Sequence, residues 1–368
     1  MIKNLIRKVV SRLGIKSNRK ILIFTSDDWG GIRLSSPSSQ IELIKKNIIN
    51  CDNRFERYDT LESNKDLEGL YDVLLKHKDQ NGKNPVITAL CNVANPNFEQ
   101  IKKSGFEKYF LEPFTKTLER YPDSDKVYKY YLDGIDKNIF VPEFHGREHV
   151  QIHWWLENLR INDSLARVAF EHNYFHIHPN KIELPKGFGI GAAFDFWNLS
   201  ELGEQQEIIE SGLDLFSQLM GYKAKLFTPP AMIMHQSLEP ILRKNDVTWL
   251  DKPLWELMPK GQGRVKNKIN WTGKIRKHGI KTLVRNAVFE PNINQNNDGV
   301  DLCMSQIETA FKHKSLAIIS NHRASFVGGI DPSNRDKGLL AIDSLFKKIL
   351  QTWPDVEFVP VRDLESIL

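Results

Sequence analysis

Residues 20–31 read KILIFTSDDWGG, and this stretch decides the fold. Its first half is an apolar run of strand length, which is typical of a buried strand, and it ends at two carboxylates followed by two glycines. Similar runs occur at 86–93, 139–144, 224–228, 247–250, 316–319 and 356–361. Amphipathic stretches of helical length, such as 38–50 and 67–77, lie between them. Alternating strands and helices predict a mostly parallel sheet, either open and doubly wound or closed into a barrel.

The composition excludes several classes of protein. The 368 residues are 40% apolar and 26% charged, which is typical of a globular chain rather than a fibre or a disordered one. No run of 18 uncharged apolar residues occurs, so the sequence predicts no membrane-spanning helix. The three cysteines, without CxxC spacing, predict neither a disulfide framework nor a thiolate metal site. A reducing compartment follows, and we expect a cytoplasmic protein.

Chemically reactive residues follow the strand-length runs. They are Asp27 and Asp28, His145 and His149, the pair Pro229-Pro230, Asp251 and His322. In α/β barrels the active site lies at the carboxyl ends of the strands, where short loops converge on one axis. The recurrence of such residues at strand ends therefore favours a barrel with a site at its C-terminal mouth.

Two histidines with i, i+4 spacing, His145 and His149, follow the strand at 139–144. On one turn of helix this spacing aims both imidazoles at one point, as zinc sites require. His153 continues the same spacing, so His149 and His153 form an alternative pair. The first pair is preferred because it lies nearer the end of the strand.

Two adjacent carboxylates, Asp27 and Asp28, end the first strand. Alternation along an extended backbone sends them to different sides, so that one can bind a cation while the other faces a bound water. The alternative is a helix N-cap beside a surface acid. Together with two imidazoles, one carboxylate supplies three ligands and leaves a coordination position open, as catalytic zinc sites do.

In this order, the motifs resemble those of the metal-dependent polysaccharide deacetylases of carbohydrate esterase family 4, the NodB type. The matching segments are TSDDWG at 25–30, HGREH at 145–149, FTPP at 227–230, DKPLW at 251–255 and SNH at 320–322. The resemblance covers residues 20–368 as one domain, with insertions around 50–138 and 257–289. It implies a distorted (β/α)7-type barrel, and a branch similar to the predicted (de)acetylases of bacterial surface glycans.

The resemblance also implies roles for individual residues. Asp27 would be the general base and His322 the general acid, which Asp251 could orient or tune. The metal ligands would be Asp28, His145 and His149. The implied cofactor is a divalent metal, most simply Zn²⁺, and the implied reaction is removal of acetyl groups from a carbohydrate.

Some residues depart from the family pattern. Thr228 stands where the family has the arginine that holds the base, and Arg285, Arg323 or Arg147 could replace it in space. Leu254 stands where the family has a second aspartate, and Ser320 stands where it has an apolar residue. Trp29 is inserted before the glycine of the first motif. The missing arginine keeps a catalytically silent glycan-binding protein as an alternative, beside another hydrolase on a related barrel.

Several residues near the predicted mouth are candidates for substrate binding. They are Trp29, Asn95, Pro230, Arg285 and Arg323. Tryptophan can stack on a sugar but more often fills a core, and the asparagine can bind a hydroxyl or simply form the Asn-Pro turn. A backbone N–H near Ala231 would stabilise the oxyanion.

Two segments are strongly basic. Residues 1–20 carry seven cations and no acid, with apolar residues at i, i+3 and i+4, so 1–19 are predicted to form a basic amphipathic helix. Such a helix contacts an anionic membrane surface, here the inner face, or docks on the domain. Residues 257–289 carry nine cations and no acid, which suits an anionic substrate or a solvated basic loop. We expect an acetylated carbohydrate as partner and no nucleic acid.

Overall fold

The computed structural model describes residues 9–184, 186–292 and 299–367. In this part of the chain nine strands form the main sheet, in the order β10-β7-β6-β5-β2-β1-β12-β11 with β13 beside β1, and every neighbouring pair is parallel. The strands are β1 (Lys20–Trp29), β2 (Ile87–Cys91), β5 (Phe140–Phe144), β6 (Leu226–Phe227), β7 (Trp249–Asp251), β10 (Lys281–Leu283), β11 (Ala287–Val288), β12 (Ala317–His322) and β13 (Val356–Phe358).

The two ends of this path belong to one segment. β10 pairs with β7 and β11 pairs with β12, and only Val284, Arg285 and Asn286 separate β10 from β11. The sheet therefore begins and ends on residues 281–288, which curls it into a barrel. If β10 and β11 are counted as one, the described barrel has seven strands: β1, β2, β5, β6, β7, β10–β11 and β12. The expected distorted (β/α)7 barrel is confirmed, and residues 281–288 of the expected insertion are part of it.

Alternate side chains of the strands form two separate cores. One cluster contains Ile21 and Ile23 of β1 and residues of β2, β6, β7, β10 and β12. Val359, Val361 and Leu364, near the C-terminus, belong to the same cluster. The larger cluster takes Leu22 and Phe24, the alternate positions of β1, and packs them against the helices. Because side chains alternate across a strand, the first cluster fills the barrel interior. The polar residues at the ends of the same strands therefore meet at one mouth.

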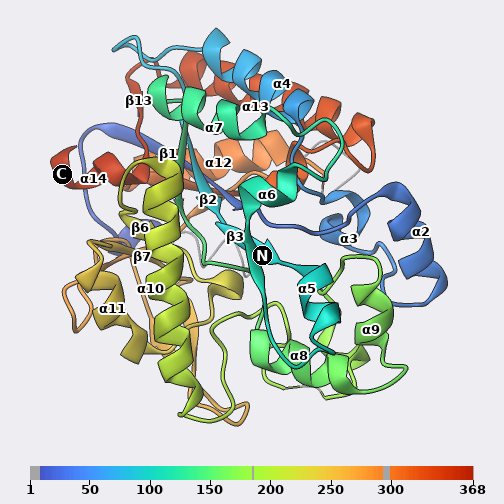
Figure 1. Ribbon diagram of the computed structural model, residues 1–368. Helices are drawn as coiled ribbons and strands as arrows, with labels where there is room; N and C mark the ends of the chain where they lie inside the picture. The colour runs from blue at the N-terminus through green and yellow to red at the C-terminus, as the bar shows by residue number, and fades with distance from the viewer. Residues whose placement is uncertain (1–8, 185, 293–298, 368) are drawn as a thin grey trace.

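Helices surround the strands (Figure 1). The longer ones against the sheet are α4 (Asn64–Lys76), α7 (Val127–Asp136), α10 (Glu201–Met220), α12 (Gly299–Lys312) and α13 (Pro332–Thr352). The others are α2 (Pro37–Lys45), α3 (Arg54–Tyr58), α5 (Phe98–Lys103), α6 (Phe114–Leu118), α8 (Ile152–Arg160), α9 (Leu165–Phe170), α11 (Glu239–Lys244) and α14 (Leu364–Ile367). α2, α5, α8 and α9 share a second apolar core and form a lobe to one side.

Two small antiparallel hairpins lie outside the barrel. One joins β3 (Ala94–Pro96) to β4 (Leu111–Pro113), and the other joins β8 (Trp255–Pro259) to β9 (Val265–Ile269). The second hairpin is the first part of the predicted basic insertion, and it stands where a barrel helix would otherwise follow β7.

Short sequence signals set the helix ends. Ser36 caps α2, accepting a hydrogen bond from the Ser39 N–H, and Pro37 begins that helix. Ser63 and Asp66 form a capping box on α4. α10 ends at Gly221, whose φ of 76° is the left-handed conformation that glycine adopts without strain.

The N-terminal basic helix lies partly outside the described residues, which begin at residue 9. Residues 9–13 are helical, and Val10 packs against Leu254 and Val284. The Ser11 hydroxyl accepts a hydrogen bond from the Asn286 side chain. This end of the segment therefore covers the seam between β10 and β11. None of the described helices is both long and apolar enough to cross a bilayer.

Candidate metal centre

The end of β1 is irregular. Its pairing with β2 shifts register between Ser26 and Trp29, and Asp28 has a left-handed backbone with a φ of 74°. A β-bulge of this kind redirects side chains and is common beside active sites. As a result, the carboxylates of Asp27 and Asp28 both contact side chains at the barrel mouth, although simple alternation predicts opposite sides.

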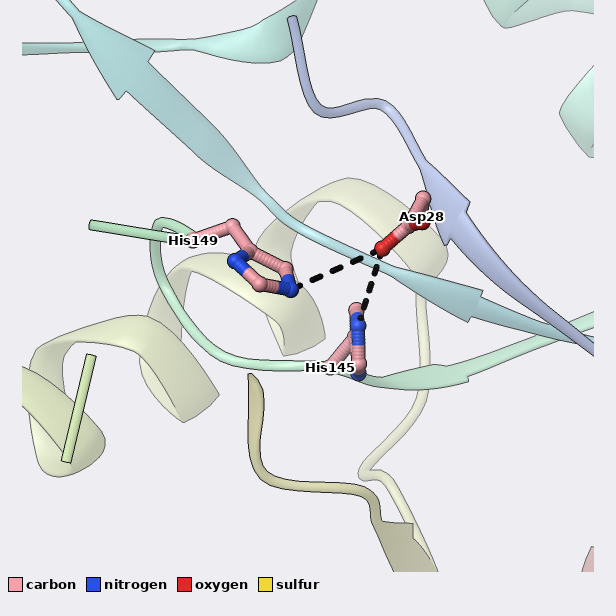
Figure 2. A group of neighbouring side chains, drawn as sticks. All are labelled: Asp28, His145 and His149. Carbon is pink, nitrogen blue, oxygen red and sulfur yellow. Dashed lines mark hydrogen bonds and ion pairs between the residues drawn. The ribbon is translucent and has the colours of Figure 1, made fainter. Parts of the chain in front are cut away.

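Asp28, His145 and His149 come together as predicted (Figure 2). The Oδ1 atom of Asp28 lies 3.2 Å from Nε2 of His145 and 3.7 Å from Nε2 of His149. One ligand atom from each residue lies within 4.8 Å of the others. His149 reaches the group from the loop after β5 and not from a helix turn, because Gly146, with a φ of 108°, turns the chain. The alternative ligand His153 lies on α8 beside Glu157.

A main-chain contact sets the tautomer of His145. Its Nδ1 lies 2.8 Å from the carbonyl oxygen of Thr228. A carbonyl only accepts, so Nδ1 carries the proton and donates it, and the lone pair of Nε2 points toward Asp28. Metal-binding histidines are oriented by contacts of this kind.

The charge states also suit a cation. Burial lowers the pKa of His149 to about 4, so its imidazole is neutral at pH 7. Burial acts to raise the pKa of Asp28, but the neighbouring His145 and His149 outweigh it, and the pKa lies well below the usual value. An ionised carboxylate and neutral imidazole nitrogens are the donors that zinc-like ions accept. These three residues therefore fit a divalent metal.

Asp27 lies beside this group, and both of its carboxylate oxygens are bound by an arginine. Nη1 and Nη2 of Arg285 donate to the two carboxylate oxygens of Asp27 at 2.9 and 2.8 Å. The Nε of Arg285 donates to Asp251 at 2.7 Å. Burial acts to raise the pKa of Asp27, but the charge of Arg285 and neighbouring groups lowers it, so the carboxylate is ionised.

Arg285 therefore takes the place that Thr228 leaves open in the family pattern. The other two candidates do not reach the base: Arg147 contacts Glu148, and Arg323 contacts Asp59 and Glu62. The Thr228 hydroxyl instead donates to Asp251 at 3.2 Å. Since Arg285 lies more than 50 residues from Thr228 in the sequence, only the closure of the barrel brings it to Asp27.

His322 stands on the other side of Asp27. Its Nε2 lies 3.6 Å from Oδ2 of Asp27, and its Nδ1 lies 2.6 Å from Oε1 of Glu290. Burial acts to lower the pKa of His322, but the Glu290 carboxylate outweighs it, and the pKa is raised. Glu290 thus orients His322, the role expected of Asp251. Sequence reasoning missed Glu290, whose only signal is an acid directly after the β11 segment.

A cavity of about 250 Å³ opens beside His149. Its lining comes from the lobe and the barrel and includes Arg33, Phe55, His176, His178 and Ala231. His176 and His178 thus both line this cavity. This cavity is the space next to the metal ligands that a substrate can enter.

The turn that carries Ala231 is strained. Ala231 and Met232 both have left-handed backbones, with φ values of 54° and 61°. Lys252 donates from Nζ to the carbonyl oxygen of Met232 at 3.1 Å, and Glu256 lies 3.3 Å from the same ammonium. Strain of this kind persists only where the surroundings impose it, and it recurs at functional sites.

All five predicted substrate-binding residues have contacts within the protein. Trp29 is a core residue against Phe140, and its indole N–H donates to Ser26. Asn95 is buried, accepting from the Ile32 N–H and donating to the Gly30 carbonyl.

Arg323 is buried on Asp59 and Glu62, and Pro230 is buried beside Gly146. The fifth residue, Arg285, is committed to Asp27 and Asp251 rather than open to substrate. All five side chains are thus used in packing, in buried hydrogen bonds or in buried ion pairs, and their contact with substrate stays a prediction.

No protein-family model matches the chain, and no curated protein matches it. Similar solved structures include a putative polysaccharide deacetylase from Mycobacterium smegmatis, with 10% identity, a TM-score of 0.48 and coverage of 97% of this chain and 92% of that one. A putative glycoside hydrolase/deacetylase from Parabacteroides distasonis has 8% identity, a TM-score of 0.49 and coverage of 96% and 72%. A 4-alpha-glucanotransferase from Thermococcus litoralis has 12% identity and a TM-score of 0.46, and the match covers 95% of this chain and 40% of that one.

Proposed function

We propose that the protein is a metal-dependent hydrolase that removes acetyl groups, N-acetyl groups above all, from a carbohydrate or a glycan precursor. Asp28, His145 and His149 would hold the metal, most simply Zn²⁺, because two imidazoles and a carboxylate leave a coordination position open. A bound ion of this kind lowers the pKa of water from about 15.7 towards 7 and so supplies hydroxide at neutral pH.

Asp27 acts as the general base in this proposal. Arg285 holds both of its oxygens, which keeps the carboxylate ionised and fixes its direction. It would take the proton of the attacking water. Asp251 keeps Arg285 in place from the other side.

His322 acts as the general acid. An amine leaves poorly unless it is protonated, and an imidazolium can supply that proton near neutral pH. Glu290 favours the protonated imidazole and fixes the ring through Nδ1, so Nε2 faces the site. The Ala231 N–H, at the cavity beside His149, would stabilise the oxyanion, a contribution of about 3–4 kcal/mol per donor.

One observation carries the proposal: three metal-ligand atoms lie within 4.8 Å of one another, beside a carboxylate held by arginine and an imidazole held by a carboxylate. In the sequence, Thr228 in place of the family's arginine kept a catalytically silent protein as an alternative. Arg285 at Asp27 removes that argument.

The experiment measures metal content and acetate release from N-acetylated glycans, with and without a chelator. We expect a stoichiometric divalent ion, and His145→Ala and His149→Ala should lose both the ion and acetate release. His153→Ala is the matched control and should keep both, because this histidine lies beside Glu157 on α8. Bound metal without acetate release from any acetylated amino sugar would favour a silent glycan-binding protein.

A further inference from the structure

One face of the β8–β9 hairpin carries exposed apolar side chains, with the exposed Asn267 and the buried Pro259 among them. Trp255 lies opposite Ile269 and Pro259 lies opposite Val265, so side chains at these positions and at Leu257 share a face. Trp255 is 54% exposed, Leu257 40%, and Val265 and Ile269 43% each. We call these four residues the hairpin patch. A large apolar surface of this kind marks an interaction site.

The hairpin itself is firmly anchored. Its opposite face buries Glu256 and Met258, and Glu256 accepts a hydrogen bond from Arg276 at 2.8 Å. At the tip, the Gln262 N–H donates to the carbonyl oxygen of Trp197, just before α10. The hairpin patch is therefore presented by a packed element.

The charge around the hairpin patch is of one sign. Lys260 and Arg264, at the tip of the hairpin next to Pro259 and Val265, are exposed, and among the described residues neither pairs with an acid. No acid occurs between residues 257 and 289 in the sequence. A basic rim around an apolar centre is complementary to an anionic interface with an apolar interior.

The N-terminal segment adjoins the base of this hairpin. The Ile15 N–H donates to the carbonyl oxygen of Thr272, and Val10 packs against Leu254. The same segment leaves Arg12 and Leu13 exposed, the latter by 48%. Exposed basic and apolar side chains therefore occur both on the hairpin and on this adjoining segment, for which the sequence left membrane contact and docking on the domain as alternatives.

We propose that the hairpin patch, with its basic rim and the adjoining N-terminal segment, docks the protein on an anionic lipid bilayer. Tryptophan and aliphatic side chains enter the boundary between headgroups and acyl chains, and lysine and arginine bind the anionic headgroups. This surface role is independent of the deacetylase proposal.

Other occupants fit less well. Nucleic acid makes use of the cations but not of exposed valine, leucine and isoleucine, since recognition there relies on phosphate contacts and aromatic stacking. A second copy of the chain would bring two basic rims together, which like charges oppose. A glycan stacks on aromatic rings, and only one of the four residues of the hairpin patch is aromatic.

The test is sedimentation of the full chain with vesicles of phosphatidylcholine, alone or mixed with phosphatidylserine. We expect binding to the mixed vesicles that weakens as salt is added. The double variant Trp255→Ser, Ile269→Ser and the charge variant Arg264→Glu, Arg12→Glu should each weaken it, the former by about tenfold or more. Leu340→Ser, a similar loss at a residue 72% exposed on α13, should bind like the wild type.

A second readout guards against misfolding of the double variant. Trp255→Phe should remove most of the blue shift of tryptophan fluorescence that mixed vesicles produce, while its thermal unfolding is unchanged. Equal binding to both vesicle types, or hairpin variants that bind like the wild type, would overturn the proposal. So would binding to acidic glycan or nucleic acid with no binding to vesicles, or a dimer that these variants break.

Discussion

Two buried arginines, Arg285 and Arg323, have the same chemistry at first sight, because each lies between two carboxylates. In both, burial acts to lower the pKa of the guanidinium, but the two acids outweigh it and raise the pKa. Arg285 sits between β10 and β11 at the barrel mouth. One of its two partners, Asp27, adjoins the metal-ligand group and His322.

Arg323 follows His322 directly, yet it turns away from the site. It binds Asp59 and Glu62 and donates to the carbonyl oxygen of Gly31. It thereby ties the end of β12 to the segment before α4 and to the loop after β1. The comparison teaches that the role of a buried arginine depends on which acids it binds: Arg285 binds the acid beside the metal-ligand group, whereas Arg323 binds acids that join neighbouring segments.

The largest expected effect is on acetate release, and it distinguishes the acids bound by Arg285 from those bound by Arg323. Asp27→Asn should lower kcat for acetate release by about 10²–10⁴-fold, because it removes the general base while keeping the shape of the side chain. Asp59→Asn changes the matching acid of the Arg323 cluster and should leave kcat within a few-fold of the wild type. Equal losses in the two variants would contradict the assignment of Asp27 as the base.

The next largest effect compares the stability and activity of variants of the two arginines themselves. Arg285→Met and Arg323→Met should each lower the free energy of unfolding by about 3–5 kcal/mol, because each leaves buried carboxylates without a partner. Urea unfolding measures this loss. Per folded molecule, Arg285→Met should also lose about 10–100-fold in activity, as second-layer residues of metal sites do, whereas Arg323→Met should not. Activity loss in both would show that the Arg323 cluster also positions the site.

A smaller effect is expected on the pH dependence of kcat when Glu290, which binds Nδ1 of His322, is changed. Glu290→Gln removes the charge that raises the pKa of His322, so the pKa should fall. The acid must be protonated, and activity is lost as pH rises through its pKa, so the alkaline limb of the kcat profile should move to lower pH. At neutral pH we expect about tenfold lower kcat. An unmoved alkaline limb would mean that another group limits the reaction there.

The smallest effect is at Thr228. Thr228→Val removes the hydroxyl that bonds Asp251 but keeps the carbonyl that orients His145, so it should cost about 1 kcal/mol of stability and at most a few-fold in kcat. Thr282→Val is the matched control, since it removes a buried hydroxyl bonded to the Trp271 carbonyl. It should lose similar stability without changing metal affinity. A large loss of metal in Thr228→Val would mean that the hydroxyl matters more than the carbonyl.

Much of the barrel was predictable because its signals are local. The runs at 20–24, 86–93, 139–144 and 316–319 are apolar over strand length, and each is a strand in the structure. Segment 281–288 was missed because two short strands flanking Arg285 resemble a basic loop. Asp28, His145 and His149 were found from motif spacing, although the loop geometry that brings His149 in differs from the helix turn expected.

The positions of most barrel strands along the chain, and of the reactive residues at their ends, follow from the sequence alone, because apolar runs of strand length dictate burial. Which arginine holds Asp27, which acid holds His322, and whether Trp29 or Asn95 meets substrate were decided only by the tertiary structure. Those contacts join residues up to 258 positions apart, and only the closed sheet brings such residues within hydrogen-bonding distance.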